Sequence, residues 1–126
     1  MVVVAAAGNR SQNNPTGNAD DVYPANQEAV LTVSGVNRSR AFDSSYSSSG
    51  TAVDLCAPGS SVIVAAPGGG TSVRSGTSFA APHIAAAAAC VRACAAGAER
   101  CGRAPDARIA MPMISAIPAG DDPRLR

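Results

Sequence analysis

The chain has 126 residues, which is about one small domain, and its ten basic residues (all arginine) and nine acidic residues leave a formal charge of +1. This balance argues against a protein that binds nucleic acid electrostatically. The longest apolar stretch, residues 84–91, is too short to cross a membrane. No charged leader with an apolar run is visible, so no signal peptide is expected. Hydrophobic residues make up 46% of the chain, but alanine supplies much of that share, and the expected core is therefore thin.

The first half of the chain predicts strands separated by long polar loops. Residues 2–7 are a continuous apolar run rich in valine, which is typical of a strand buried on both faces of a parallel sheet. Residues 10–27 are rich in Asn, Ser, Asp, Gly and Pro and are expected to form a surface loop. A second strand is predicted over residues 29–36, and another polar loop over residues 37–50. The pattern indicates an α/β domain.

The second half predicts two short strands and one long helix. The strands are expected at residues 53–56 and 62–65, with a turn at the three glycines 68–70. Ten of the seventeen residues from 80 to 96 are alanine, the best helix former, and they predict a helix over residues 78–96. Ser78 can cap its first turn. The helix is apolar almost all round, so we expect it to be buried.

The cysteines and the C-terminal segment remain open at this stage. The four cysteines permit two disulfides without demanding them. Cys56 is expected to be a buried small residue, whereas a Cys94–Cys101 or Cys90–Cys101 bridge is possible. No pattern typical of a zinc site is present. Residues 98–126 lose clear periodicity and are expected to form a poorly ordered tail that holds at most one short element.

Residues 75–83 carry the strongest chemical signal. They read Ser-Gly-Thr-Ser-Phe-Ala-Ala-Pro-His and deliver Ser78 to the N-terminus of the predicted helix. Unpaired backbone N–H groups and the helix dipole favour negative charge there. A serine nucleophile at this place would have its oxyanion stabilised. Taken alone, a serine in this position is far more often simply a helix cap.

Four segments in the same order resemble one known family. They are Ala-Ala-Ala-Gly-Asn at residues 5–9, Tyr-Pro-Ala at residues 23–25 with the strand at 30–36, Val-Asp-Leu-Cys-Ala-Pro-Gly at residues 53–59 after Ser-Ser-Ser-Gly at 47–50, and Gly-Thr-Ser-Phe-Ala-Ala-Pro-His at residues 76–83. Over about residues 2–96 the chain resembles the subtilisin-like serine peptidases (the S8 family, or subtilases). The resemblance implies a three-layer α/β fold with a parallel sheet. It also implies a serine endopeptidase mechanism.

The resemblance assigns roles to matching positions. Ser78 matches the nucleophile, and Asn9 matches the residue whose side-chain amide stabilises the oxyanion. Ala6, Ala7 and Gly8 would line one side of the pocket for the substrate side chain, and Thr77 would fix the turn at the substrate site. No cofactor is expected. Calcium sites are common in the family, but no acidic cluster in this chain matches one.

The general base and its orienting carboxylate have no match. The family orders its triad Asp, His and Ser along the chain, and the only histidine, His83, sits five residues after Ser78 on the same helix, about 140° around its axis. We therefore expect His83 to be structural. Residues 1–97 are expected to be the C-terminal half of a peptidase domain.

Two functions follow from this pattern. The first is a serine endopeptidase acting on peptide or protein substrates, with no nucleic-acid or membrane partner, whose triad His and Asp lie outside the chain. The second is a truncated, inactive remnant or a binding or regulatory fragment. The family implies secretion, while the oligomeric state is left open.

Overall fold

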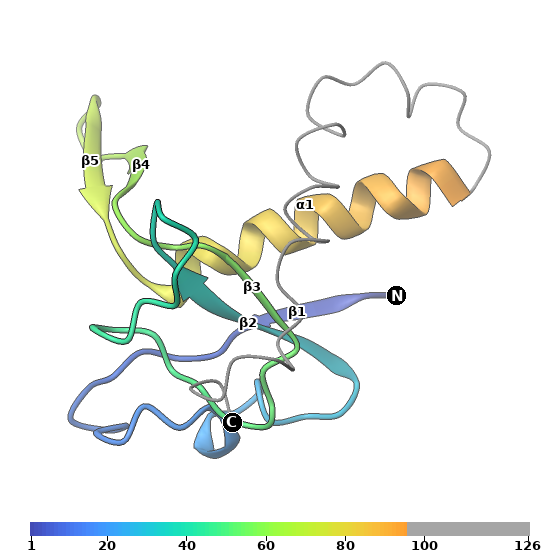
Figure 1. Cartoon of the computed structure of the whole chain (residues 1–126). Coiled ribbons are helices and arrows are strands. Elements are labelled where there is room, and N and C mark those ends of the chain that lie inside the picture. The colour runs from blue at the N-terminus through green and yellow to red at the C-terminus, as the bar shows by residue number, and fades with distance from the viewer. Residues whose placement is uncertain (96–126) are drawn as a thin grey trace.

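The computed structural model describes residues 1–95, which form a three-stranded sheet, a two-stranded hairpin and one long helix (Figure 1). In chain order the elements are β1 (Val3–Ala6), the short 3-10 helix η1 (Ala19–Asp21), β2 (Val30–Val36), β3 (Leu55–Pro58), β4 (Val62–Ala65), β5 (Thr71–Arg74) and α1 (Thr77–Ala95). The expectations for the side chain of Cys94, for Cys101 and for residues 98–126 lie outside the described residues.

The sheet is parallel, with the strand order β1-β2-β3. Val3 of β1 lies opposite Val30 of β2, and Val33 of β2 lies opposite Leu55 of β3. The parallel arrangement confirms the sequence prediction. The expectation that the first strand is buried on both faces is wrong, because Val2 and Val3 are 43% and 40% exposed. Among the described strands, β1 pairs only with β2.

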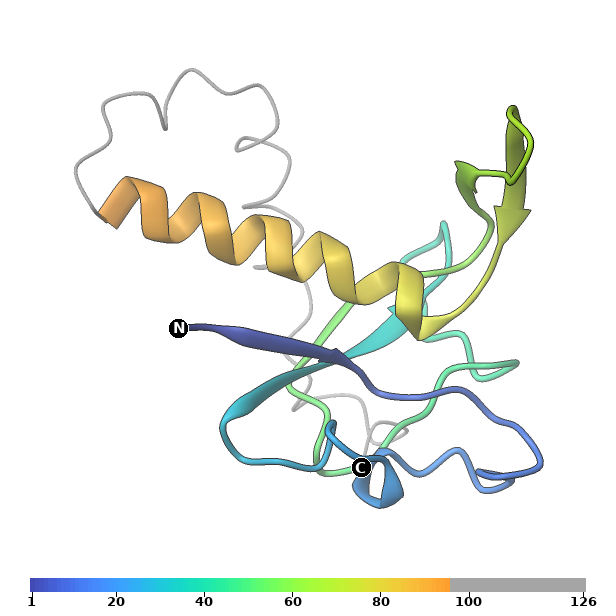
Figure 2. The ribbon, with the colours of Figure 1, turned by 180° about the vertical axis from the view of Figure 1, so that it is seen from behind.

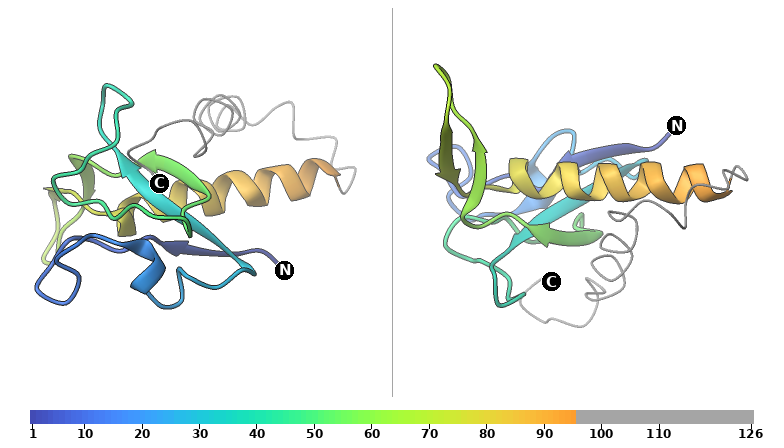
Figure 3. Two further views of the ribbon diagram at one scale, coloured as in Figure 1. Left: turned by 60° about the horizontal axis from the view of Figure 1, so that its bottom comes forward. Right: turned by 90° about the horizontal axis from the view of Figure 1, so that it is seen from above.

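Helix α1 lies across one face of the sheet and contacts all three strands (Figure 3). The core between them consists of Val33, Ala57, Ala80 and Ile84. Small side chains on the helix let the two layers approach closely. The expectation that α1 is buried all round is wrong, since the sheet covers one face and leaves a stripe of exposed residues that includes Ala85, Ala86 and Ala89.

The hairpin β4–β5 projects from the end of the molecule where α1 begins (Figure 1). Its two strands are antiparallel, and the facing residues Ile63 and Val73 are 66% and 63% exposed. The glycine turn at 68–70 is confirmed, with positive φ at each position. β5 was not predicted, because its residues are largely polar. η1 was not predicted either, although Asn18 accepts the Asp20 N–H in a cap that favours such a turn.

Buried hydroxyl groups hold the loops against the sheet. The Thr32 hydroxyl donates to the Ala25 carbonyl at 2.5 Å, and the Ser34 hydroxyl donates to the Ser48 carbonyl at 2.6 Å. Within residues 1–95, each buried side-chain nitrogen or oxygen atom has a hydrogen-bond partner. Satisfied hydroxyls avoid the cost of burying an unpaired polar group. Cys56 is buried as expected.

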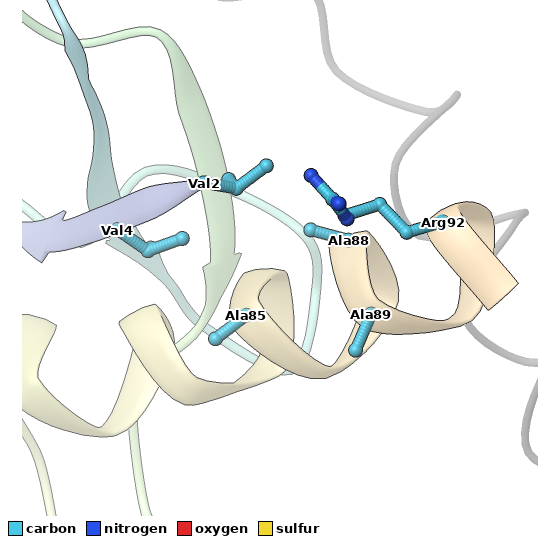
Figure 4. A pocket seen from close by; sticks show the side chains of 6 residues that line it. All are labelled: Val2, Val4, Ala85, Ala88, Ala89 and Arg92. Carbon is cyan, nitrogen blue, oxygen red and sulfur yellow. The ribbon is translucent and has the colours of Figure 1, made fainter.

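A groove of about 250 Å³ separates the start of β1 from the C-terminal half of α1 (Figure 4). Its lining is apolar except for one guanidinium group and consists of Val2, Val4, Ala85, Ala88, Ala89 and Arg92. Seen from behind, the N-terminus of the chain lies beneath this half of the helix (Figure 2). The groove is distinct from the turn that carries Ser78.

No helix in the described part of the chain is both long and apolar enough to span a bilayer.

We expect the open edge of β1 to drive self-association of the chain, because unpaired strand groups beside apolar side chains template pairing with another chain. Val3→Lys should raise the dissociation constant of self-association by at least about fivefold. Sedimentation velocity over a concentration series measures this constant. Val73→Lys places the same charge on the exposed hairpin and is the matched control. Equal effects of the two substitutions would assign the association to overall surface charge instead.

Candidate functional site at the start of the long helix

Asn9 stands where the chain leaves β1 and turns toward the start of α1. Gly8 has φ of +91°, a conformation that favours glycine, and its carbonyl accepts the Ser48 N–H at 3.0 Å. The next residue, Arg10, donates its N–H to the Tyr46 carbonyl at 2.7 Å. Asn9 is thus held between two backbone hydrogen bonds to one loop.

The Asn9 side chain joins two parts of the chain that are 68 residues apart. Its Oδ1 accepts the backbone N–H of Thr77 at 3.0 Å and the Thr77 hydroxyl at 3.2 Å. Both bonds use the carbonyl oxygen, so the Nδ2 donors are left for another acceptor. Nδ2 lies on the side of Gly76, 3.5 Å from where a Cβ on that glycine would stand.

The same contact caps the helix, which begins one residue earlier than predicted. Because α1 starts at Thr77, Ser78 already lies within its first turn. The expectation that Ser78 caps the helix is therefore wrong, since the capping oxygen is Asn9 Oδ1. Local sequence patterns cannot reveal such a cap, because its acceptor comes from a distant strand.

The turn before the helix leaves Ser78 exposed. Gly76 donates its N–H to the Gly59 carbonyl at 2.9 Å, and Phe79 donates its N–H to the Gly76 carbonyl at 3.0 Å. The Ser75 hydroxyl accepts the Ser61 N–H at 2.9 Å. Among the residues that the structure describes, no carbonyl accepts the Ser78 N–H. This group belongs to the first helical turn, where such N–H groups favour an anion.

The other predicted site residues differ in their accessibility. Ala6 and Gly8 are partly exposed, and their predicted contact with substrate stays a prediction. Ala7 is fully buried and packs with Ala19 and Val53, so its methyl group faces the core. Thr77 is fully buried and bonded to Asn9, which gives it a role in shaping the turn.

His83 is turned toward its own helix. Its Nδ1 lies 2.8 Å from the Phe79 carbonyl oxygen one turn earlier. A carbonyl can only accept, so Nδ1 carries the proton in this contact. Within residues 1–95 no hydrogen bond joins His83 to Ser78, which agrees with the expectation that His83 is not the base for Ser78.

A second polar cluster, not predicted from the sequence, lies beside the turn that precedes α1. The hydroxyls of Ser45 and Ser60 donate to the two carboxylate oxygens of Asp43 at 2.5 and 2.6 Å. These hydrogen bonds hold the pKa of Asp43 below its ordinary value of 3.8. The phenol oxygen of Tyr46 lies 3.2 Å from the Ser60 hydroxyl, and burial raises the pKa of Tyr46. The sequence does not indicate this cluster, because serines and an aspartate are ordinary residues of a polar loop.

Comparisons with known proteins agree on one family. The sequence model of the subtilase family matches residues 1–116. Subtilisin-like protease 1 of Trichophyton verrucosum is 46% identical over 89 residues, which are 71% of this chain and 21% of that protein. Subtilisin-like protease 1 of Arthroderma otae is 42% identical over 93 residues, which are 74% and 18% of the two chains. The chain therefore spans about a fifth of the length of these curated relatives.

A solved structure is also similar to this chain. The prenylagaramide maturation protease PagA superposes with a TM-score of 0.60 and 32% sequence identity. The match covers 71% of this chain and 31% of that protein.

In the Asn9 carboxamide, Oδ1 holds the start of α1 and Nδ2 carries the free donors, and two substitutions separate these roles. Asn9→Asp keeps an oxygen that accepts both bonds from Thr77, so we expect its free energy of unfolding to stay within about 1 kcal/mol of the parent. Asn9→Leu leaves the Thr77 donors unpaired and should cost about 1–3 kcal/mol. Urea denaturation followed by circular dichroism measures both. Equal losses in the two variants would contradict this division.

The acid sensitivity of the fold should depend on Asp43. Its pKa is lowered in the folded state, so its stabilising contribution is present above its unfolded pKa and is lost as the pH falls through its folded pKa. We therefore expect Asp43→Asn to flatten the decline of unfolding free energy between about pH 5 and pH 2. Asp21→Asn changes an exposed carboxylate in η1 and is the control. An unchanged pH profile in Asp43→Asn would show that other groups cause the acid loss.

Proposed function

The chain belongs to the subtilase family, and on this premise we propose that it supplies the nucleophile and an oxyanion donor of a serine endopeptidase. Its parallel sheet with a helix on one face is part of the subtilisin-like α/β fold. Residues 1–97 are assigned to the peptidase domain, and peptides or proteins are the proposed substrates. No group of three or more His, Cys, Asp or Glu side chains that could hold a metal ion lies among the described residues, and no step is assigned to calcium.

Ser78 is the proposed nucleophile. Its oxygen attacks the scissile carbonyl carbon, the carbonyl oxygen becomes an oxyanion, and collapse of the intermediate expels the amine and leaves an acyl-enzyme. The exposed position of Ser78 at the first turn of α1 gives a substrate access to it. The helix dipole adds a favourable field for the negative charge that forms there.

Asn9 is the proposed oxyanion donor, and its contact with Thr77 is the observation that carries the function. Because Oδ1 is occupied by two bonds from Thr77, the amide is oriented with Nδ2 as the free donor. The Ser78 N–H is proposed as the second donor. A preorganised pair of donors stabilises the developing charge without reorganising during the reaction.

The proton from Ser78 needs an acceptor, and the described residues 1–95 place no histidine beside its hydroxyl. His83 is the single histidine of the 126 residues, and its ring is bonded to the Phe79 carbonyl. We therefore assign the general base and its orienting carboxylate to polypeptide outside these residues. The same observation favours a second candidate, in which the 126-residue chain alone is an inactive fragment.

A fluorophosphonate probe with added imidazole tests the proposed site. Imidazole acts as a soluble base, so we expect the labelling rate of Ser78 to rise with imidazole concentration and to vanish in Ser78→Ala. Asn9→Asp should lower the imidazole-supported rate by about 10²–10³, a magnitude established for such a donor in this same family. Peptide mapping by mass spectrometry locates the label.

Two further outcomes decide between the candidates. Without imidazole, we expect the chain to hydrolyse no chromogenic peptide above the Ser78→Ala background. Labelling that is spread over several serines and is insensitive to Asn9→Asp would favour the inactive fragment. Hydrolysis that disappears in Ser78→Ala would overturn the assignment of the base to outside polypeptide.

A further inference from the structure

We propose that Tyr46 is a positioning residue that fixes the nucleophile turn relative to Asn9, by pressing its phenol oxygen against the backbone of Gly59. This inference rests on the proposed roles of Ser78 and Asn9. Nothing in the sequence motifs singles out Tyr46, which lies in a Ser-rich loop between β2 and β3.

The contacts around Tyr46 form a closed ring. Asn9 binds Thr77, and the neighbouring Gly76 donates its N–H to the Gly59 carbonyl at 2.9 Å. Gly59 packs against the phenol of Tyr46. The Tyr46 carbonyl accepts the Arg10 N–H at 2.7 Å, and Arg10 is bonded to Asn9 in the chain. Tyr46 therefore closes the ring, with its backbone on the Asn9 side and its side chain on the Ser78 side.

Two glycines make room for the phenol. A Cβ on Gly35 would stand 2.2 Å from the Tyr46 hydroxyl oxygen, and a Cβ on Gly59 would stand 2.6 Å from it. The same Cβ on Gly59 would also stand 2.9 Å from the Gly76 carbonyl oxygen and 3.3 Å from the Ala80 Cβ, so Gly59 is closely surrounded. A shift of the phenol therefore moves Gly59, which follows β3 and accepts the Gly76 N–H.

Hydrogen bonds fix the hydroxyl in this place. The Ser60 hydroxyl gives its single proton to Asp43, so the Tyr46 O–H donates to Ser60. Asp43 in turn is anchored by its own N–H to the Gly35 carbonyl at 3.1 Å. The hydrogen bonds run from Tyr46 through Ser60 to Asp43. Because they are directional, they fix the position of the phenol more narrowly than packing alone does.

Fixed geometry matters here because the two proposed groups come from distant parts of the chain. An oxyanion site loses effect when its donors drift from the position of the developing charge. The Asn9–Thr77 bonds restrain one side of the turn, and the Gly76–Gly59 bond restrains the other. Tyr46 supports the second restraint.

Amide hydrogen exchange by NMR on the full chain tests this inference without relying on activity. Tyr46→Phe removes only the hydroxyl, and we expect the Gly76 N–H to exchange about tenfold faster relative to the Ala7 N–H, which bonds to the Val33 carbonyl in the sheet. A merely structural role would accelerate both amides equally. Tyr23→Phe, at the other tyrosine, which is 79% exposed, is the matched control.

A second variant checks the hydrogen-bond chain. Ser60→Ala should raise the relative exchange of Gly76 as Tyr46→Phe does, and the double variant should add little, because both changes break the same link. Additive effects, or no change in the ratio of Gly76 to Ala7 exchange, would overturn the inference.

Fluorophosphonate labelling with imidazole separates this inference from the proposed function. Tyr46→Phe should lower the Ser78 labelling rate about tenfold, and Tyr23→Phe should leave it unchanged. Absence of labelling in the parent chain, together with selective Gly76 exchange, would reject the proposed function and keep the positioning role. Normal labelling in Tyr46→Phe with an unchanged exchange ratio would reject the positioning role and keep the function.

Discussion

The hydrogen bonds from Thr77 to the Asn9 carboxamide are the constraint on which the rest of the site depends. They connect the end of the first strand to the start of the last helix across 68 residues. One side chain thereby caps α1, orients its own Nδ2 donors and sets the approach of Ser78 to them. Capping the helix and orienting the donor are consequences of the same contact, so loss of the Asn9 oxygen disturbs both.

The composition of the chain explains why polar contacts carry so much of this geometry. An alanine-rich helix buries little apolar area per residue, although it lets α1 approach the sheet closely. Long loops with few large apolar side chains must be held in another way. Buried hydroxyls such as Thr32 and Ser34 bond directly to loop carbonyls. The loops that carry Tyr46 and Asn9 are thus positioned by directional bonds, which define a geometry more narrowly than apolar contact does.

The sequence predicted those features whose causes are local. The apolar runs of β1, β2 and β4 and the alanines of α1 predicted their elements, and Ser78 and Asn9 were identified from short motifs. β3 begins at Leu55, two residues later than predicted, because its pairing with β2 decides its bounds. The Asn9 cap and the contacts of Tyr46 could not be predicted, since each joins residues that only the folded chain brings together.

The exposed stripe on α1 includes Ser78 at its N-terminal end. Ser78, Pro82, Ala85 and Ala89 follow one another at spacings of four, three and four residues, which places them on one face of the helix. All four are exposed, and Ala85 and Ala89 also line the groove beside β1. Ser78 thus stands at one end of an exposed helix face that continues to the groove beside β1.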